Sequence, residues 1–214
     1  MSSALHWVAT SGTIAVLVVY ELALALLGHR NEQRIAMTAH AALRAQWLDA
    51  VSAQPGSEIL GVQTLRNALM SAIMTASTAA LGLMGAVTLA SPSLVAGFAE
   101  GSTTAPLQFT PRLMIELSLL VLLFAALLCA AMAVRYYNHA SFIVGMPVGS
   151  VQRKQWTATG GVYLRRAGLL FSRALRYLIL VAPMLVCLLY PAAGPIAALL
   201  VVAVLYRFDR VGTH

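Results

Sequence analysis

The sequence predicts an all-α polytopic membrane protein with four transmembrane helices and two amphipathic helices in cytoplasmic loops. Of its 214 residues, 60% are hydrophobic and only 10% are charged, and the mean hydropathy is +0.81. Soluble domains are about half apolar and about a quarter charged, so the surplus apolar surface here must face lipid. The length favours one membrane domain over residues 1–214 and excludes a large multidomain transporter.

Four apolar stretches are long enough to cross a bilayer, because a spanning helix needs about 20 residues. They cover residues 11–27, 67–90, 113–134 and 177–206. The fourth stretch is longer than a span requires and contains Pro183, Pro191 and Pro195, and proline kinks or breaks helices. We therefore expect one long, bent or broken helix there. The alternative is a re-entrant hairpin that turns at residues 191–195 and returns both ends to one side.

The basic residues orient these helices. Four of the 14 lie between the first and second stretches, and seven lie between the third and fourth. Because basic loops stay in the cytoplasm, we expect both loops inside and the N-terminus outside. The Ala-rich, Arg-rich composition favours a bacterial inner (plasma) membrane protein. Arg207 and Arg210 would then lie outside in a four-span protein, which keeps the hairpin alternative open.

Both cytoplasmic loops contain a helix with one apolar face. In residues 33–53, apolar residues recur every four positions, and in residues 162–176 an apolar stripe faces away from the arginines. Basic amphipathic helices beside a bilayer usually lie at its surface. Membrane lipids, including anionic headgroups, are therefore the expected partners of these helices.

Glu21 is the most anomalous residue in the predicted spans. A carboxylate near the middle of an apolar stretch costs about 2.5 kcal/mol or more unless it is protonated or paired. It is interpreted either as an ion or proton site, or counter-charge to an arginine, or as a protonated side chain that bonds to a neighbouring helix or subunit.

Small and polar residues form a stripe along the second stretch. Asn67, Ser71, Thr75, Thr78, Gly82 and Ala86 recur at steps of four and three, which places them along one helix face. Such a face favours tight helix packing. A polar pore lining is the alternative interpretation.

Two motifs are predicted to lie at one depth, at the cytoplasmic ends of the second and third stretches. The first is Arg66-Asn67, and the second comprises Arg135, Tyr137, Asn138 and His139. Together with the N-terminus of the second helix, they would hold a phosphate, a lipid headgroup or an inorganic anion. The alternative is that the arginines only anchor the helices at the interface.

The sequence contains no motif of a known catalytic site. It lacks a Ser-His-acid arrangement, a phosphate-binding glycine loop, HExxH and a dinucleotide fingerprint, so we expect neither an enzyme nor a cofactor. His139 has no second histidine or acid at ligand spacing, so no metal site is expected. The bilayer accounts for the excess of basic residues without nucleic acid.

Short motifs along nearly the whole chain resemble those of a known protein family. They are Trp47, Leu65-Arg66-Asn67, Ala76-Ser77-Thr78, Arg135 with Tyr137-Asn138, Gly145, Arg176-Tyr177, Pro191 and Leu205-Tyr206-Arg207. In order and spacing the chain resembles the family called domain of unknown function 599, which consists of bacterial and plant four-helix membrane proteins. The resemblance implies a membrane protein and assigns no activity to any residue.

Two functions fit these features. The first, which Glu21 and the two arginine motifs favour, is an oligomeric ion channel or small-solute transporter, formed as a homo-oligomer because four helices enclose little room. The second is a non-catalytic membrane scaffold or accessory subunit that binds lipids or a larger membrane complex. A hydrated stripe over residues 67–86 would favour conduction, and a dry stripe packed on another helix would favour the scaffold.

Overall fold

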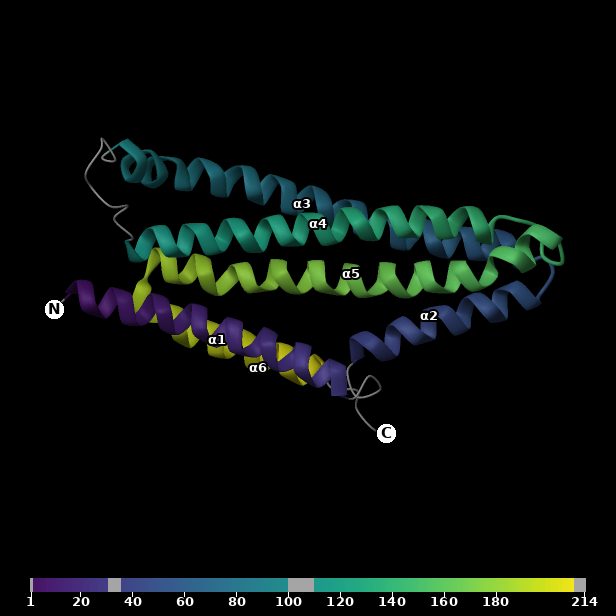
Figure 1. Ribbon diagram of the computed structural model, residues 1–214, viewed down its shortest axis with the longest axis horizontal. Coiled ribbons are helices and arrows are strands. Elements are labelled where there is room, and N and C mark those ends of the chain that lie inside the picture. Colours follow the sequence, from purple (N-terminus) through teal and green to yellow (C-terminus); the bar gives the residue numbers. More distant parts are fainter. Residues whose placement is uncertain (1, 31–35, 100–109, 210–214) are drawn as a thin grey trace. The chain divides into compact units, whose positions relative to one another are not determined.

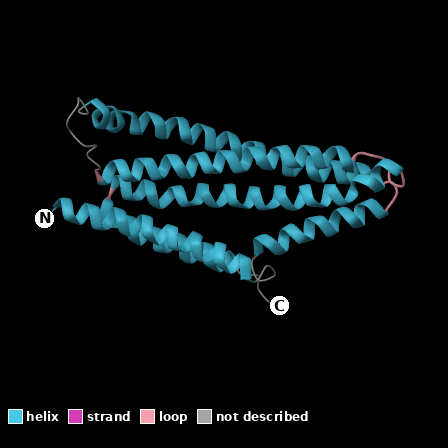
Figure 2. Ribbon diagram, viewed as in Figure 1, coloured by secondary structure: helices cyan, strands magenta, loops and turns pink. Residues whose placement is uncertain are grey.

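The computed structural model describes residues 2–30, 36–99 and 110–209, and within these ranges it contains helices and no strand, which confirms the all-α prediction (Figure 2). The elements are α1 (Ser2–Arg30), α2 (Ala36–Ala53), α3 (Glu58–Ala99), α4 (Pro111–Val144), α5 (Val151–Leu189), a 3-10 turn (Pro191–Ala193) and α6 (Gly194–Asp209) (Figure 1). Residues 33–35 of the first predicted loop helix lie outside the described ranges.

Five of the described helices are long and apolar enough to cross a membrane: α1, α3, α4, α5 and the 3-10 turn together with α6. The expected arrangement of four spans and two separate loop helices is not confirmed. The predicted fourth span comprises two helices, and the predicted loop helix over residues 162–176 is continuous with α5. The helices in the centre of the chain are also long, since α3 has 42 residues and α5 has 39.

The helical path is interrupted at Pro191, between α5 and α6. Tyr190 is extended, with φ −142° and ψ 91°, and the short turn that follows is closed by a 3.0 Å hydrogen bond from the amide of Ala193 to the carbonyl of Tyr190. Figure 1 shows α6 running back alongside α1, as in the hairpin alternative. Gly194 permits this turn because a Cβ there would lie 2.6 Å from the Cys187 Sγ. Pro183 lies inside α5, so this proline does not end the helix.

The chain forms two compact units. Unit 1 comprises Met1–Leu27, Thr78–Ala125 and Arg176–Phe208; unit 2 comprises Gly28–Ser77, Ala126–Leu175 and Asp209–His214. Helices α3, α4 and α5 contribute residues to both units, and each unit has its own apolar core.

The core of unit 1 joins α1, α3, α4, α5 and α6. Its buried members are Leu17, Tyr20, Ala86, Ile115, Leu119, Leu123, Leu180, Met184, Cys187, Ala198 and Leu205. Close helix packing depends on small residues here, because a Cβ at Gly82 of α3 would come within 3.0 Å of the Leu123 side chain of α4.

The core of unit 2 joins α2 to parts of α3, α4 and α5. Its buried members are Leu48, Leu65, Ala72, Ala133, Tyr137, Ala140, Val144, Leu164 and Ala167. Because Leu48 is fully buried, α2 packs its apolar face against protein. The turn between α2 and α3 contains Gly56 at a φ of +84°, a conformation that glycine adopts without strain.

The buried face of α4 repeats every seven residues. Its buried positions alternate steps of four and three along Leu119, Leu123, Ala126, Ala130, Ala133, Tyr137, Ala140 and Val144. This 3.5-residue period is typical of coiled-coil packing, and alanine at the contact lets helices approach closely. On α3, Leu65, Ala72, Ala79 and Ala86 are buried at the same seven-residue interval.

Candidate functional site

The predicted site residues fall into both units. Unit 1 holds Glu21, Thr78 and Gly82, whereas unit 2 holds Arg66, Asn67, Ser71, Thr75, Arg135, Tyr137, Asn138 and His139. The two groups are therefore described separately.

Side chains from α4 and α5 form an aromatic-basic cluster in unit 2, which consists of Tyr136, His139, Tyr163 and Arg166. The Tyr163 ring centroid lies 5.7 Å from that of Tyr136 and 5.9 Å from that of His139. The Arg166 guanidinium lies 5.9 Å from the centroid of Tyr136, within cation–π range. Tyr136 and His139 lie on one face of α4, and Tyr163 and Arg166 lie on one face of α5, because residues three positions apart are neighbours on an α-helix. The cluster thus presents an exposed cation and an exposed imidazole beside two phenols.

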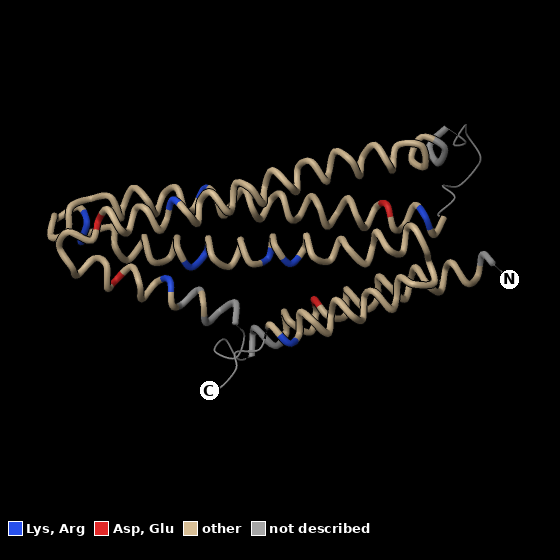
Figure 3. The backbone as a smooth tube through the Cα atoms, turned by 180° about the vertical axis from the view of Figure 1, so that it is seen from behind, with Lys and Arg blue, Asp and Glu red and all other residues tan. Residues whose placement is uncertain are grey.

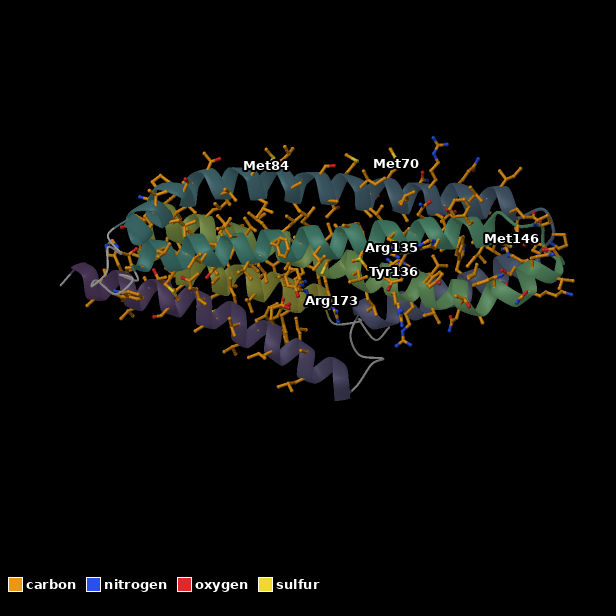
Figure 4. The ribbon with its side chains drawn as sticks, turned by 45° about the horizontal axis from the view of Figure 1, so that its top comes forward. Met70, Met84, Arg135, Tyr136, Met146 and Arg173 are labelled. Atoms are coloured by element: carbon orange, nitrogen blue, oxygen red, sulfur yellow. The ribbon has the colours of Figure 1, made fainter. Side chains whose placement is uncertain are left out.

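The predicted motif on α4 divides between two faces. Tyr137 is only 2% exposed and lies in the core of unit 2. Arg135, which Figure 4 labels, is exposed, as are Asn138 and His139. Tyr136, which is not among the predicted site residues, contacts the neighbouring helix instead. Its three-residue spacing from His139 was the signal that could have identified it.

Arg66 and Asn67 are exposed on α3. In the described part of the chain, no hydrogen bond, ion pair or ring contact joins either residue to the aromatic-basic cluster. The predicted helix N-terminus beside them is wrong, because α3 begins at Glu58, directly after the turn at Gly56. Convergence of the two motifs on one anion stays a prediction.

Arg153 is a structural residue that the sequence reasoning counted only as a loop charge. It is 1% exposed, and its Nη1 donates to the carbonyl of Val144 and, at 2.9 Å, to that of Met146. Its Nη2 also donates to the Ser52 hydroxyl at 3.1 Å. Nearby, a Glu58 carboxylate oxygen accepts a 2.8 Å bond from the Val148 amide. These bonds fasten α2 and the first turn of α3 to the α4–α5 loop.

Unit 2 carries a strong positive charge. Its described side chains include eight basic residues, namely Arg44, Arg66, Arg135, Arg153, Lys154, Arg165, Arg166 and Arg173, but only two acidic ones, Asp49 and Glu58 (Figure 3). Arg44 lies directly against Gly168, and its buried Nη1 has no hydrogen-bond acceptor among the described residues. An anionic oxygen would provide that acceptor.

The polar stripe of α3 does not coincide with the buried face of that helix. Thr75 and Ala86 are buried and Gly82 is half-buried, whereas Asn67, Ser71 and Thr78 are exposed. Hydroxyls of the stripe donate to their own helix backbone: Ser71 bonds to the Asn67 carbonyl at 3.1 Å, and Thr75 to that of Ser71 at 2.8 Å. The stripe therefore runs along the edge between the packed and exposed faces.

Glu21 is half-buried on α1 in unit 1. The preceding residue, Tyr20, is buried, and its ring centroid lies 5.9 Å from the guanidinium carbon of the buried Arg176. Arg176 therefore contacts the residue that precedes Glu21 on α1. The protonation or transport role of Glu21 stays a prediction.

The described residues contain no group of three or more His, Cys, Asp or Glu that could hold a metal ion. No curated protein and no solved structure matches this chain. The model of the family described as "Protein of unknown function, DUF599" matches residues 8–213. Because this match covers nearly the whole chain and the described part is helical with five potential spans, the protein belongs to that family.

Proposed function

We propose that the protein is a non-catalytic membrane scaffold or accessory subunit whose unit 2 binds anionic lipid headgroups. The observation that carries the proposal is the excess of basic side chains in unit 2 together with its aromatic-basic cluster. Arginine guanidinium presents several N–H donors to phosphate, and tyrosine rings are favoured at the headgroup level of a bilayer. Each basic residue near an anionic leaflet adds about 1 kcal/mol of attraction.

The packing inside unit 2 supports a scaffold in preference to a conduit through one protomer. In unit 2, Ala72, Ala133 and Ala140 are fully buried, and a Cβ at Gly61 would come 2.5 Å from a Val144 methyl. Such contacts leave no room for a file of water between the helices. The exposed residues of α3 are then available to a second copy of the chain or to a larger membrane complex.

A second candidate function is an oligomeric ion channel or small-solute transporter. It is favoured by Asn67, Ser71 and Thr78, which are exposed polar residues on a helix apolar enough to span a membrane. This function requires a homo-oligomer in which these side chains face a water-filled path between subunits. In the scaffold, they face lipid or a partner.

The two-helix form of residues 177–206 changes the predicted topology. With five spans and the N-terminus outside, the C-terminus and Arg207 lie on the cytoplasmic side, as the basic loops do, in agreement with the positive-inside rule. Expressed in a bacterial inner membrane, a green fluorescent protein fused after His214 is expected to fluoresce, and alkaline phosphatase fused there is expected to be inactive. A fusion at Gly149 is the cytoplasmic control. Active phosphatase at the C-terminus would restore the four-span arrangement.

The lipid proposal predicts a selective loss of anionic lipid in one variant. Arg166→Gln is expected to weaken retention of phosphatidylglycerol about tenfold, because a hydrogen bond to a charged group contributes about 1.5–3 kcal/mol. Native mass spectrometry of protein exchanged into mixed phosphatidylglycerol and phosphatidylcholine measures this retention. Lys154→Gln is the matched control, since it removes one positive charge from an exposed site on the same helix. Equal losses of phosphatidylglycerol in both variants would mean that it is held by general electrostatic attraction, and would contradict a binding site at the aromatic-basic cluster.

A further inference from the structure

Unit 1 contains a cavity of about 300 Å³ where the N-terminal parts of α1 and α4 meet the C-terminal end of α5. It is lined by His6, Thr10, Pro111, Arg112, Ile115, Cys187, Leu188, Leu189 and Pro191. This volume lies at the lower end of the range for small-molecule sites. The cavity is independent of the aromatic-basic cluster, all of whose members belong to unit 2.

Thr10 is an orphaned polar group in the wall of this cavity. The residue is only 1% exposed, and its hydroxyl has no hydrogen-bond partner among the described residues. Thr13, one turn further along α1, is also buried, but its hydroxyl donates to the Ala9 carbonyl at 2.8 Å. Buried hydroxyls are nearly always bonded, so the difference between the two threonines points to a missing partner at Thr10.

The other polar groups of the cavity are suited to a negative charge. The Arg112 side chain is 65% exposed and its Nε donates to Glu116 at 2.9 Å, which leaves further N–H donors on the guanidinium. Glu116 is 1% exposed and does not line the cavity, so its ion pair positions the arginine. The cavity also borders the first turn of α4, which has 34 residues and whose dipole favours an anion at this end. His6 adds a further group that can donate a hydrogen bond.

The remaining wall is apolar. Ile115 of α4 and Leu188 and Leu189 of α5 give the ligand a hydrophobic surface. A ligand that fits both the polar groups and the apolar wall of the cavity has a compact anionic head and a short apolar tail. Two sources supply this chemistry: a free carboxylic acid and a membrane phospholipid.

We propose that the cavity binds an anionic amphiphile, whose negatively charged head accepts hydrogen bonds from Thr10 and Arg112 and whose apolar tail lies against Ile115, Leu188 and Leu189. The Thr10 hydroxyl and the Arg112 guanidinium select the charge. The cavity volume limits the part of the ligand that it encloses to a small organic acid or the headgroup end of a lipid.

Hexanoate is the probe for the free acid. Titration of the purified full chain with sodium hexanoate is expected to saturate. Intrinsic tryptophan fluorescence reports the binding, because Trp7 adjoins His6 on α1, and His6 lines the cavity. Hexylamine and hexanol, which have the same tail but no negative charge, are expected to bind at least about tenfold more weakly, the effect of losing one charge-assisted hydrogen bond. Equal binding of hexanol or hexylamine would overturn the proposal.

Thr10→Val is the decisive variant. It is nearly isosteric and removes a hydroxyl that has no partner among the described residues. The ligand-free thermal midpoint is therefore expected to stay at or above that of the wild type, whereas hexanoate affinity falls at least about fivefold. Arg112→Gln is expected to weaken binding further. Thr13→Val is the matched control on the same helix and is expected to retain hexanoate affinity within about twofold. Wild-type affinity in Thr10→Val would overturn the proposal.

Native mass spectrometry of protein extracted with its membrane lipid distinguishes the two sources. A phospholipid that is retained by the wild type and by Thr13→Val, but lost by Thr10→Val, would assign the site to a lipid even if hexanoate does not bind. If hexanoate does not saturate and Thr10→Val retains the same lipids as the wild type, the cavity does not recognise an anion and the proposal fails.

Discussion

Replacing Ala133 with leucine is expected to lower the free energy of unfolding by about 2–3 kcal/mol, which is a large effect for a substitution at a single alanine. Ala133 is fully buried on the repeating face of α4, within the core of unit 2. Three added carbon atoms cannot fit between closely packed helices without moving them. The change would be measured as the free energy of unfolding in sodium dodecyl sulfate, followed by circular dichroism.

Ala131→Leu is the matched control for this substitution. Ala131 is exposed and lies two positions away on α4, so the same added side chain meets no packed neighbour there. Its free energy of unfolding is expected to stay within about 0.5 kcal/mol of the wild type. Similar losses in both variants would mean that residue 133 does not lie in a close helix contact.

Replacing Arg153 with methionine is expected to lower the free energy of unfolding by about 3 kcal/mol or more. Methionine keeps much of the side-chain volume but removes the donors that satisfy the carbonyls of Val144 and Met146. The Val144 carbonyl would remain buried without this partner, and the link from the loop to α2 through Ser52 would be lost. The same detergent titration measures the effect.

Lys154→Met makes the same chemical change at the next residue. Lys154 is exposed, so its loss is expected to leave the free energy of unfolding nearly unchanged. If Arg153→Met were as stable as Lys154→Met, the bonds from Arg153 would contribute nothing to the fold of unit 2.

Hydropathy was enough to predict an all-helical membrane protein, but not where its helices end. Residues 67–90 and 113–134 are the apolar centres of α3 and α4, which extend to Glu58 and Val144. An apolar run stops where polar side chains begin, whereas a helix stops where its backbone hydrogen bonds stop. The two limits coincide only when a turn residue such as Gly56 adjoins the apolar run.

The prolines show why the path of residues 177–206 could not be read from sequence. Pro183 and Pro191 both lack a backbone donor, yet only Pro191 ends a helix. The difference depends on the extended conformation of Tyr190 and on the close approach of Gly194 to Cys187, both of which depend on tertiary packing.

The site residues show a similar limit. The residues of the predicted stripe all belong to α3, but neighbouring faces of this helix are both rich in small residues, so the pattern did not distinguish Ser71 from Ala72. Likewise, Tyr136 and Tyr137 differ in burial only because Tyr137 follows the seven-residue repeat of α4. The orphaned hydroxyl of Thr10 has no sequence signal, since it depends on contacts between three helices.

A cryo-EM structure of the protein extracted with its native lipid tests the central claim most directly. The scaffold proposal predicts headgroup density within hydrogen-bond distance of Arg166 and Tyr163, and dry contacts along the alanine face of α4. It also predicts that Asn67, Ser71 and Thr78 face lipid or another polypeptide. A continuous water-filled path bordered by Asn67, Ser71 and Thr78 would contradict this account and establish the conducting alternative.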